Sequence, residues 1–115
     1  MKKEIQIFIE DILESIKKIE EYTYSMKKKE FLLNSQAQDS VIRRLEIIGE
    51  AVKNISQDFR NEYSDIPWKQ IAGMRDVLIH GYFGVNMERV WVVVKRDLPH
   101  LKFHITNILN KLSQR

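Results

Sequence analysis

The stretch Val41-Ile-Arg-Arg-Leu45-Glu-Ile-Ile48-Gly-Glu-Ala-Val52-Lys-Asn-Ile55-Ser-Gln-Asp-Phe59 decides the fold. Its apolar residues recur at spacings of four, three, four, three and four positions from Val41 to Phe59. On an α-helix this spacing forms a single apolar stripe, of the kind that packs lengthwise against near-antiparallel neighbours. The stretch therefore predicts a long amphipathic helix in an all-α protein.

Helical periodicity extends over most of the remaining chain. Residues 3–22 predict a helix with Ile5, Phe8, Ile12, Ile16 and Ile19 on one face, and Phe31 to Leu33 predict a short helical turn. Residues 67–80 predict one helix or two short ones. The segment Trp91 to Val94 has the composition of a strand, but an apolar stripe from Val90 to Leu112 favours a helix that Pro99 splits near Asp97. We expect an antiparallel bundle of four to five helices.

Length and composition limit the class of protein. The 115 residues suffice for one domain, residues 1–115, and 43% hydrophobic with 30% charged residues suits a globular chain. Four glycines and two prolines provide few turns for an all-β fold. The sequence has no cysteine, which excludes disulfides and cysteine-ligated metal sites.

No apolar run approaches the ~20 residues of a membrane-spanning helix. The amino-terminal residues lack the pattern of a signal peptide. These features predict a cytoplasmic protein without membrane association. A net charge of +3 permits contact with a polyanion, but the main basic cluster, Lys27 to Lys29, is flanked by acids and suits a solvated loop.

Three polar functions are concentrated in Arg75-Asp-Val-Leu-Ile-His80-Gly-Tyr82, at the expected end of a helix. Arginine offers a permanent cation suited to phosphate, and histidine can exchange a proton near neutral pH. Asp76 and His80 would share a helical face, whereas Arg75 would lie about 140° away from His80. A purely structural interpretation is also open, in which His80 caps a helix end and Arg75 pairs with Glu46 or Glu50.

The same segment resembles the R-x-x-x-x-H-x-Y signature of HEPN-domain toxins of the HepT type, at Arg75, His80 and Tyr82. The block from Ile66 to Phe83 is similar to the central block of that family almost residue for residue. Val41 to Ala51, which ends in Ile-Gly-Glu-Ala, resembles its long helix, and Val90 to Pro99 also fits.

The resemblance implies a HEPN-like helical fold and a metal-independent RNA endonuclease without a cofactor. It implies a homodimeric toxin of a type VII-like toxin–antitoxin pair, whose partner is a minimal nucleotidyltransferase antitoxin that transfers AMP onto Tyr82. Arg75 and His80 become the catalytic residues acting on RNA. Asp76, Glu50 and Arg44 are supporting candidates, in that Asp76 would orient His80, Glu50 would hold Arg75, and Arg44 would line the RNA groove.

Other interpretations remain open. His100 and His104 are spaced as two metal ligands on one helical face, but no second ligand motif accompanies them, so no metal site is predicted. The chain could instead be a non-catalytic helical subunit or nucleotide-binding module for a nucleotidyltransferase. A third possibility is a basic module that simply holds nucleic acid.

Overall fold

The computed structural model describes residues 2–73 and 86–114, with side chains from residue 4 onward, and contains no β-strand within these ranges. The long helices are α1 (Lys2–Thr23), α3 (Ser35–Lys53) and α7 (Leu98–Ser113). Shorter elements are α2 (Lys28–Leu32), α4 (Gln57–Glu62), α6 (Met87–Val92) and the π-helix η1 (Val93–Asp97). Residues 68–73 are also helical. The all-α class is confirmed. The described helices outnumber the expected four to five because two connections between longer helices each form a short helix, α2 and α4.

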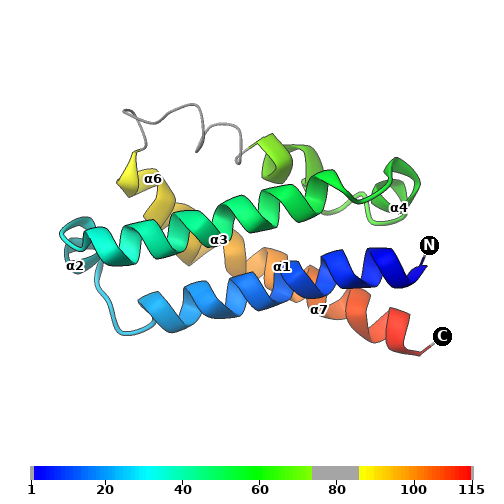
Figure 1. The fold of residues 1–115 in the computed structure, drawn as a ribbon, viewed down its shortest axis with the longest axis horizontal. Helices are drawn as coiled ribbons and strands as arrows, with labels where there is room; N and C mark the ends of the chain where they lie inside the picture. The colour runs from blue at the N-terminus through cyan, green and yellow to red at the C-terminus, as the bar shows by residue number, and fades with distance from the viewer. Residues whose placement is uncertain (1, 74–85, 115) are drawn as a thin grey trace.

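The helix α1 forms the centre of the bundle, since it contacts both α3 and α7. Figure 1 shows α3 and α7 running antiparallel to α1. The core side chains of α1 are Ile9, Ile12, Ile16 and Ile19, each with no exposed surface. Removing apolar surface from water is the main favourable contribution to such packing. The apolar stripe predicted for residues 3–22 is therefore the face that α1 buries.

The stripe from Val41 to Phe59 is buried as expected, but it belongs to two helices instead of one. The helix α3 ends at Lys53, and Ser56 begins α4 by accepting a hydrogen bond from the backbone N–H of Phe59 at 3.3 Å. The Arg60 guanidinium donates to the carbonyls of Ile55 and Val52. These groups satisfy carbonyls that a continuing helix would have used, so the chain turns while its apolar residues stay inside.

The carboxy-terminal region is helical, and the strand-like composition of Trp91 to Val94 does not determine its structure. Asn86 caps α6 by accepting from the N–H groups of Glu88 and Arg89. The expected interruption near Asp97 is the π-helix η1, which ends where α7 begins. Pro99 lies in the first turn of α7. Proline has no N–H and its ring displaces the carbonyl four residues earlier, which explains a wider turn at this point.

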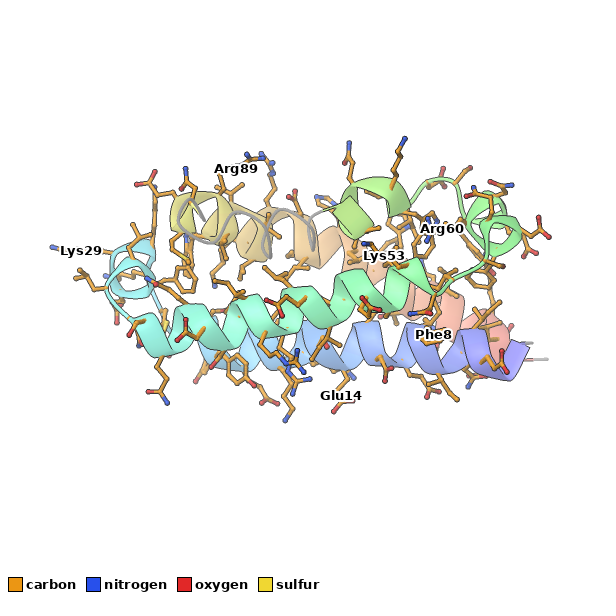
Figure 2. All side chains as sticks on the ribbon, turned by 45° about the horizontal axis from the view of Figure 1, so that its top comes forward. Phe8, Glu14, Lys29, Lys53, Arg60 and Arg89 are labelled. Atoms are coloured by element: carbon orange, nitrogen blue, oxygen red, sulfur yellow. The ribbon has the colours of Figure 1, made fainter. Side chains whose placement is uncertain are left out.

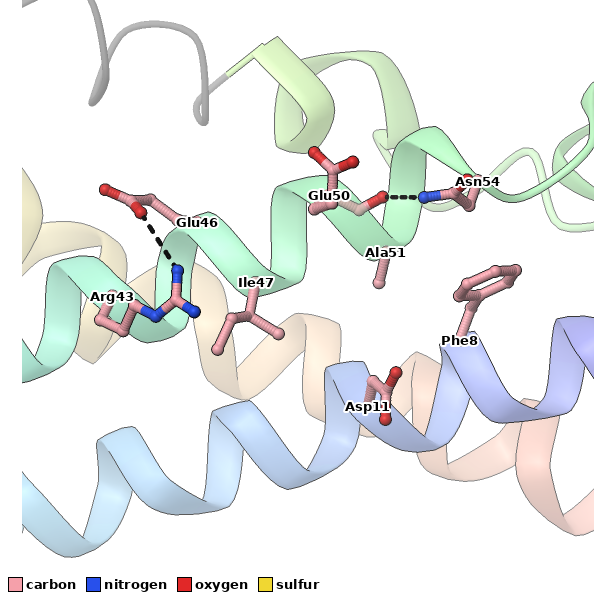
Figure 3. Close-up of a pocket in the computed structure, with 8 residues that line it drawn as sticks. All are labelled: Phe8, Asp11, Arg43, Glu46, Ile47, Glu50, Ala51 and Asn54. Atoms are coloured by element: carbon pink, nitrogen blue, oxygen red, sulfur yellow. Dashed lines mark hydrogen bonds and ion pairs between the residues drawn. The ribbon is translucent and has the colours of Figure 1, made fainter.

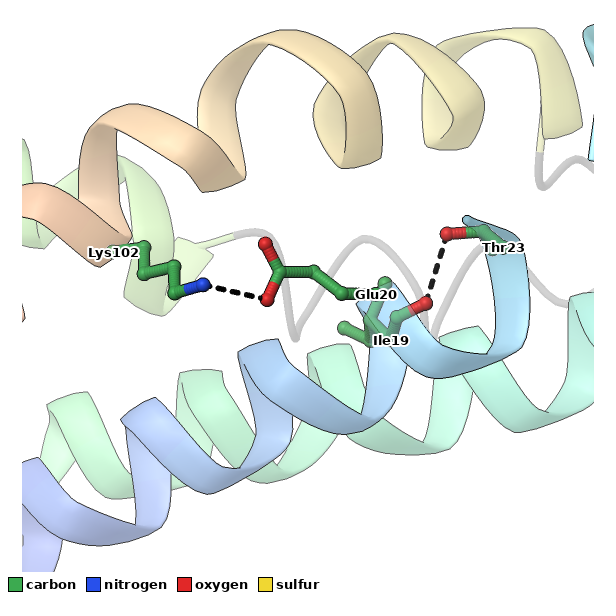
Figure 4. Close-up of polar contacts among 4 residues, drawn as sticks. All are labelled: Ile19, Glu20, Thr23 and Lys102. Atoms are coloured by element: carbon green, nitrogen blue, oxygen red, sulfur yellow. Dashed lines mark hydrogen bonds and ion pairs between the residues drawn. The ribbon is translucent and has the colours of Figure 1, made fainter. Parts of the chain in front are cut away.

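Two long-range polar contacts join α1 to the carboxy-terminal helices. Lys102 Nζ of α7 lies 2.9 Å from Glu20 Oε1 of α1, and Lys95 Nζ donates to the carbonyl of Thr23 at 3.3 Å. Figure 4 shows the first contact, together with the Thr23 hydroxyl bonded to the carbonyl of Ile19 within α1. Both contacts orient the carboxy-terminal helices along α1.

The turn containing α2 is anchored by an aromatic contact. Phe31 has no exposed surface, and its ring centroid lies 5.2 Å from that of Trp91 in α6. The same Trp91 ring is contacted from η1, where Lys95 Nζ lies 4.8 Å from the ring centroid. The lysines 27–29 are exposed, as expected, but Lys28 and Lys29 begin the helix α2 instead of lying in a loop. None of the described helices is long and apolar enough to cross a membrane.

Candidate functional site

The residues that carry the proposed chemistry, Arg75, Asp76, His80 and Tyr82, lie outside the described residues. Their roles therefore remain predictions from the sequence. The structure does describe both attachment points of this segment, namely the helical residues 68–73 before it and Asn86 after it. It also describes the two supporting candidates on α3, Arg44 and Glu50.

The helix that leads into the segment is firmly anchored. Trp68 is only 5% exposed, and its indole Nε1–H donates to the carbonyl of Tyr63 at 2.9 Å. Ile66 and Ile71 are buried on either side, and the Ile71 N–H donates to the Pro67 carbonyl at 3.1 Å. Residues 68–73, which lead into residues 74–85, are therefore held firmly against the bundle.

The segment ends at an equally defined point. The Asn86 side chain accepts two backbone N–H groups of α6, and Val90 of that helix is 5% exposed. Figures 1 and 2 place residues 68–73 and α6 on the same side of α3. A single helix therefore runs alongside both attachment points of the functional segment.

The two supporting candidates on that helix do not lie together. Arg44 and Glu50 are six residues apart, which separates them by about 9 Å along the helix and about 120° around it. Arg44 is half-buried, whereas Glu50 is exposed. In Figure 3 the Glu50 carboxylate points away from α1, on the side of α3 where residues 68–73 lie. Of the two candidates, Glu50 is the one directed toward the functional segment's attachment helix.

A groove between α1 and α3 contains residues that the sequence reasoning did not single out. This cavity of about 260 Å³ is lined by Phe8 and Asp11 of α1 and by Arg43, Glu46, Ile47, Glu50, Ala51 and Asn54 of α3 (Figure 3). Arg43 lies 3.8 Å from Glu46, and the Asn54 side chain donates to the Glu50 carbonyl at 2.9 Å. Asp11 adds a further carboxylate to this lining, whereas the Glu50 carboxylate points away from α1 (Figure 3). Asp11 has no sequence signal that distinguishes it from other surface acids on α1.

The other polar candidates are His100 and His104, which lie on the exposed side of α7. His104 is half-buried, and its ring contacts that of Phe103 at a centroid distance of 5.7 Å. Over residues 4–73 and 86–114, no three His, Asp or Glu side chains gather closely enough to hold a metal ion.

A helical bundle with an anchored helix leading into R-x-x-x-x-H-x-Y defines the class of protein as a HEPN-like all-α protein. The chain matches the family described as Ribonuclease HepT-like over residues 12–108. It belongs to this HepT-like ribonuclease family, in agreement with the resemblance seen in the sequence.

Named relatives agree with this assignment. The chain is 49% identical over 102 residues to a protein of Thermococcus cleftensis named "Probable ribonuclease HepT", covering 89% of this chain and 93% of that protein. It is 49% identical over 114 residues to a Methanocaldococcus jannaschii protein named "Gamma-glutamylcyclotransferase and putative RNase". That match covers 99% of this chain but 51% of the relative, so the chain spans about half of that protein. No solved structure matches the chain.

Proposed function

We propose that this protein is a metal-independent endoribonuclease that acts as the toxin of a type VII-like toxin–antitoxin pair. The observation that carries the proposal is the HepT-like match over residues 12–108, which includes Arg75, His80 and Tyr82. Support also comes from the relatives whose names describe ribonucleases. The substrate class is therefore RNA, a polyanion that a chain of net charge +3 can approach.

In this proposal Arg75 and His80 perform the cleavage. The Arg75 guanidinium neutralises charge that develops on the scissile phosphate. His80 removes the proton of the RNA 2′-hydroxyl as a general base, or delivers a proton to the departing 5′-oxygen as a general acid. Attack of the 2′-oxygen on phosphorus then breaks the bond to the 5′-oxygen. Neither proton transfer requires a metal ion.

Three other residues support these two. Asp76 precedes His80 by four positions, a spacing that would let its carboxylate orient the imidazole on a helix. Glu50 is the better placed of the α3 candidates, because its carboxylate lies on the side of residues 68–73. We assign Glu50 to positioning of the Arg75 guanidinium, and Arg44 to the edge of the RNA path.

A homodimer accounts for the angular separation of the catalytic pair. On one helix Arg75 and His80 would point about 140° apart, so a single copy would not direct both at one phosphate. Two copies that present this segment to each other would bring an arginine of one and a histidine of the other to a shared site. The dimer is therefore part of the catalytic proposal.

Regulation in this proposal acts at Tyr82. A minimal nucleotidyltransferase antitoxin transfers AMP onto its phenolic oxygen, two residues from His80. The new phosphodiester adds bulk and negative charge where substrate phosphate must bind, which excludes RNA by steric overlap and like-charge repulsion.

The experiment that tests the proposal is RNA cleavage by the purified protein in the presence of a metal chelator. Arg75→Ala and His80→Ala should each lower the rate by about 100-fold or more. Lys18→Ala is the matched control, because it removes a cation that pairs with Glu21 on α1 and belongs to no predicted site. If both active-site variants cleave as fast as the parent, the assigned roles are wrong.

Two further measurements test the biological setting. Expression of the parent should arrest growth, and co-expression with the nucleotidyltransferase should restore it and add AMP to Tyr82 but not to a Tyr82→Phe variant. Absence of cleavage and of growth arrest, with a stable nucleotidyltransferase complex, would instead identify a non-catalytic partner subunit.

A further inference from the structure

A cavity of about 440 Å³ lies between the helical residues 68–73 and the wall formed by η1 and α7. We call it the η1–α7 cavity. Its apolar surface comes from Ile71, Leu98 and Leu101, which are 9%, 3% and 7% exposed. Its polar lining includes Gln70, Asp65, Arg96, Asp97, His100 and His104. An apolar floor with a few converging polar groups is the usual composition of a small-molecule site, and the volume lies within the usual range.

The chemistry of the lining suits a nucleobase better than a phosphate. His100, His104 and Arg96 contribute flat side chains, the kind on which unstacked RNA bases lie. Gln70 and Asp65 on the facing wall contribute donors and acceptors that can read the edge of a base. Arg96 Nε lies 3.1 Å from Asp97 Oδ1, so the strongest cation of the lining already has a carboxylate partner. A phosphate would meet little unopposed positive charge in this cavity.

Two of these side chains contact a neighbour in the sequence. The His104 ring is edge-on to Phe103 at an interplanar angle of 75°, and Arg96 is held by Asp97. The wall itself includes Val93, Arg96 and Asp97 of η1. A π-turn displaces side chains relative to a regular helix, and such turns are frequent at functional sites.

The cavity is close to the proposed catalytic residues along the chain. Arg75 follows Ile71 by four positions, and four residues span at most roughly 14 Å in any conformation. Even at the short spacing of stacked nucleotides, about 3.4 Å, this distance spans no more than about four nucleotides. One RNA strand can therefore reach both the cavity and the phosphate at Arg75.

We infer that the η1–α7 cavity binds one unstacked base of the RNA substrate, within about four nucleotides of the cut, and thereby gives the enzyme a nucleotide preference. His100 and His104 supply the stacking surface, and Gln70 contacts the edge of the base. This inference rests on the proposed ribonuclease function and assigns specificity residues to it.

The test compares cleavage positions on a single-stranded RNA that contains all four bases in every order near the cut. The variants are Gln70→Ala and the double variant His100→Ala with His104→Ala, and Asn110→Ala on the exposed surface of α7 is the matched control. Loss of the stacking surface should reduce the ratio of cleavage at preferred and disfavoured sites by about tenfold. Because Arg75 and His80 are unchanged, cleavage should continue with a flatter pattern.

The outcomes separate the two proposals. If the parent cuts no RNA, the proposed function and this inference both fail. If the parent cuts RNA and the cavity variants keep its site preference, only the inference is wrong. A variant that changes the oligomeric state by size-exclusion chromatography would show that the cavity is an interface between copies, which also overturns the inference. Should the double variant fail to fold, His100→Ala alone provides the same comparison at an exposed position.

Discussion

Ser15→Ala is expected to stabilise the protein, although the change removes a polar side chain. Ser15 lies in α1 between fully buried isoleucines, is 1% exposed, and its Oγ has no hydrogen-bond partner among the described residues. A buried polar group without a partner keeps its desolvation penalty, about 1–3 kcal/mol. The parent protein therefore carries a cost that alanine would remove.

The size of the effect follows from three contributions. Relief of the unpaired hydroxyl contributes about 1 kcal/mol at the lower end of its range. The better helix propensity of alanine adds about 0.5 kcal/mol. The small void left by the oxygen atom offsets part of this gain. We expect a net increase of about 1 kcal/mol in the free energy of unfolding, which raises Tm by about 4 °C for a chain of this length.

Urea denaturation followed by far-ultraviolet circular dichroism measures this difference. Ser40→Ala is the matched control, since Ser40 also lies in a helix but its Oγ donates to the Gln36 carbonyl at 2.9 Å near the surface. Both variants gain the same helix propensity, so the difference between them isolates the buried hydroxyl. Protein concentration must be equal in all samples, because assembly affects apparent stability. The reasoning is refuted if Ser15→Ala gains no more stability than Ser40→Ala.

Three further changes test particular contacts of the fold. Arg60→Lys should lower the free energy of unfolding by about 1–3 kcal/mol, because lysine cannot reproduce the guanidinium fork that binds two carbonyls at the end of α3; equal stability in urea would contradict this. Asn86→Ala should lower the free energy of unfolding by about 1 kcal/mol, because it removes the cap of α6, whereas Asn86→Asp should keep most of this stability. If thermal unfolding shows the same loss for both variants, Asn86 does not act as a cap. Lys102→Met should lower the free energy of unfolding by less than about 1 kcal/mol, because the side chains of Lys102 and Glu20 are 38% and 44% exposed. Salt should screen this ion pair, so a loss of stability that grows with added salt would contradict the prediction.

The sequence predicted burial more reliably than helix continuity. The stripe from Val41 to Phe59 identifies buried side chains correctly, yet the helix ends at Lys53. A hydrophobic pattern reports which side faces the core, and a turn that preserves this side leaves the pattern intact. The signal for the break was local, in Asn54 and Ser56, whose side chains bind backbone groups.

The carboxy-terminal region illustrates tertiary context overriding propensity. The β-branched run near Val92 to Val94 favours a strand in isolation, but Val94, Leu98 and Leu101, spaced four and three apart, can be buried on one face only in a helix. Pro99 predicted an interruption, and the structure shows that a π-turn provides it. The position of an interruption could be predicted from one residue, whereas its geometry depends on packing.

The candidate site was accessible to sequence reasoning only through its motif. Arg75, His80 and Tyr82 are identified by their spacing and by family resemblance, because neither residue types nor periodicity distinguish them from structural residues. Asp11 and Gln70 show the opposite case, since they line cavities only because α1, α3, η1 and residues 68–73 come together in the fold. No local pattern in the sequence records such neighbours.

The π-turn at Val93–Asp97 has a consequence for how this chain tolerates changes in length. Before it, α6 contacts α2, and after it, α7 contacts α1, so the turn sets the rotation of one helix relative to the other. Deleting one residue there would replace the i→i+5 hydrogen bonds of the π-turn with the i→i+4 bonds of an α-helix, so Leu101, Ile105 and Ile108 would keep facing α1. A one-residue deletion should therefore be better tolerated in this stretch than inside α1 or α3, where it would rotate the rest of the helix by about 100°.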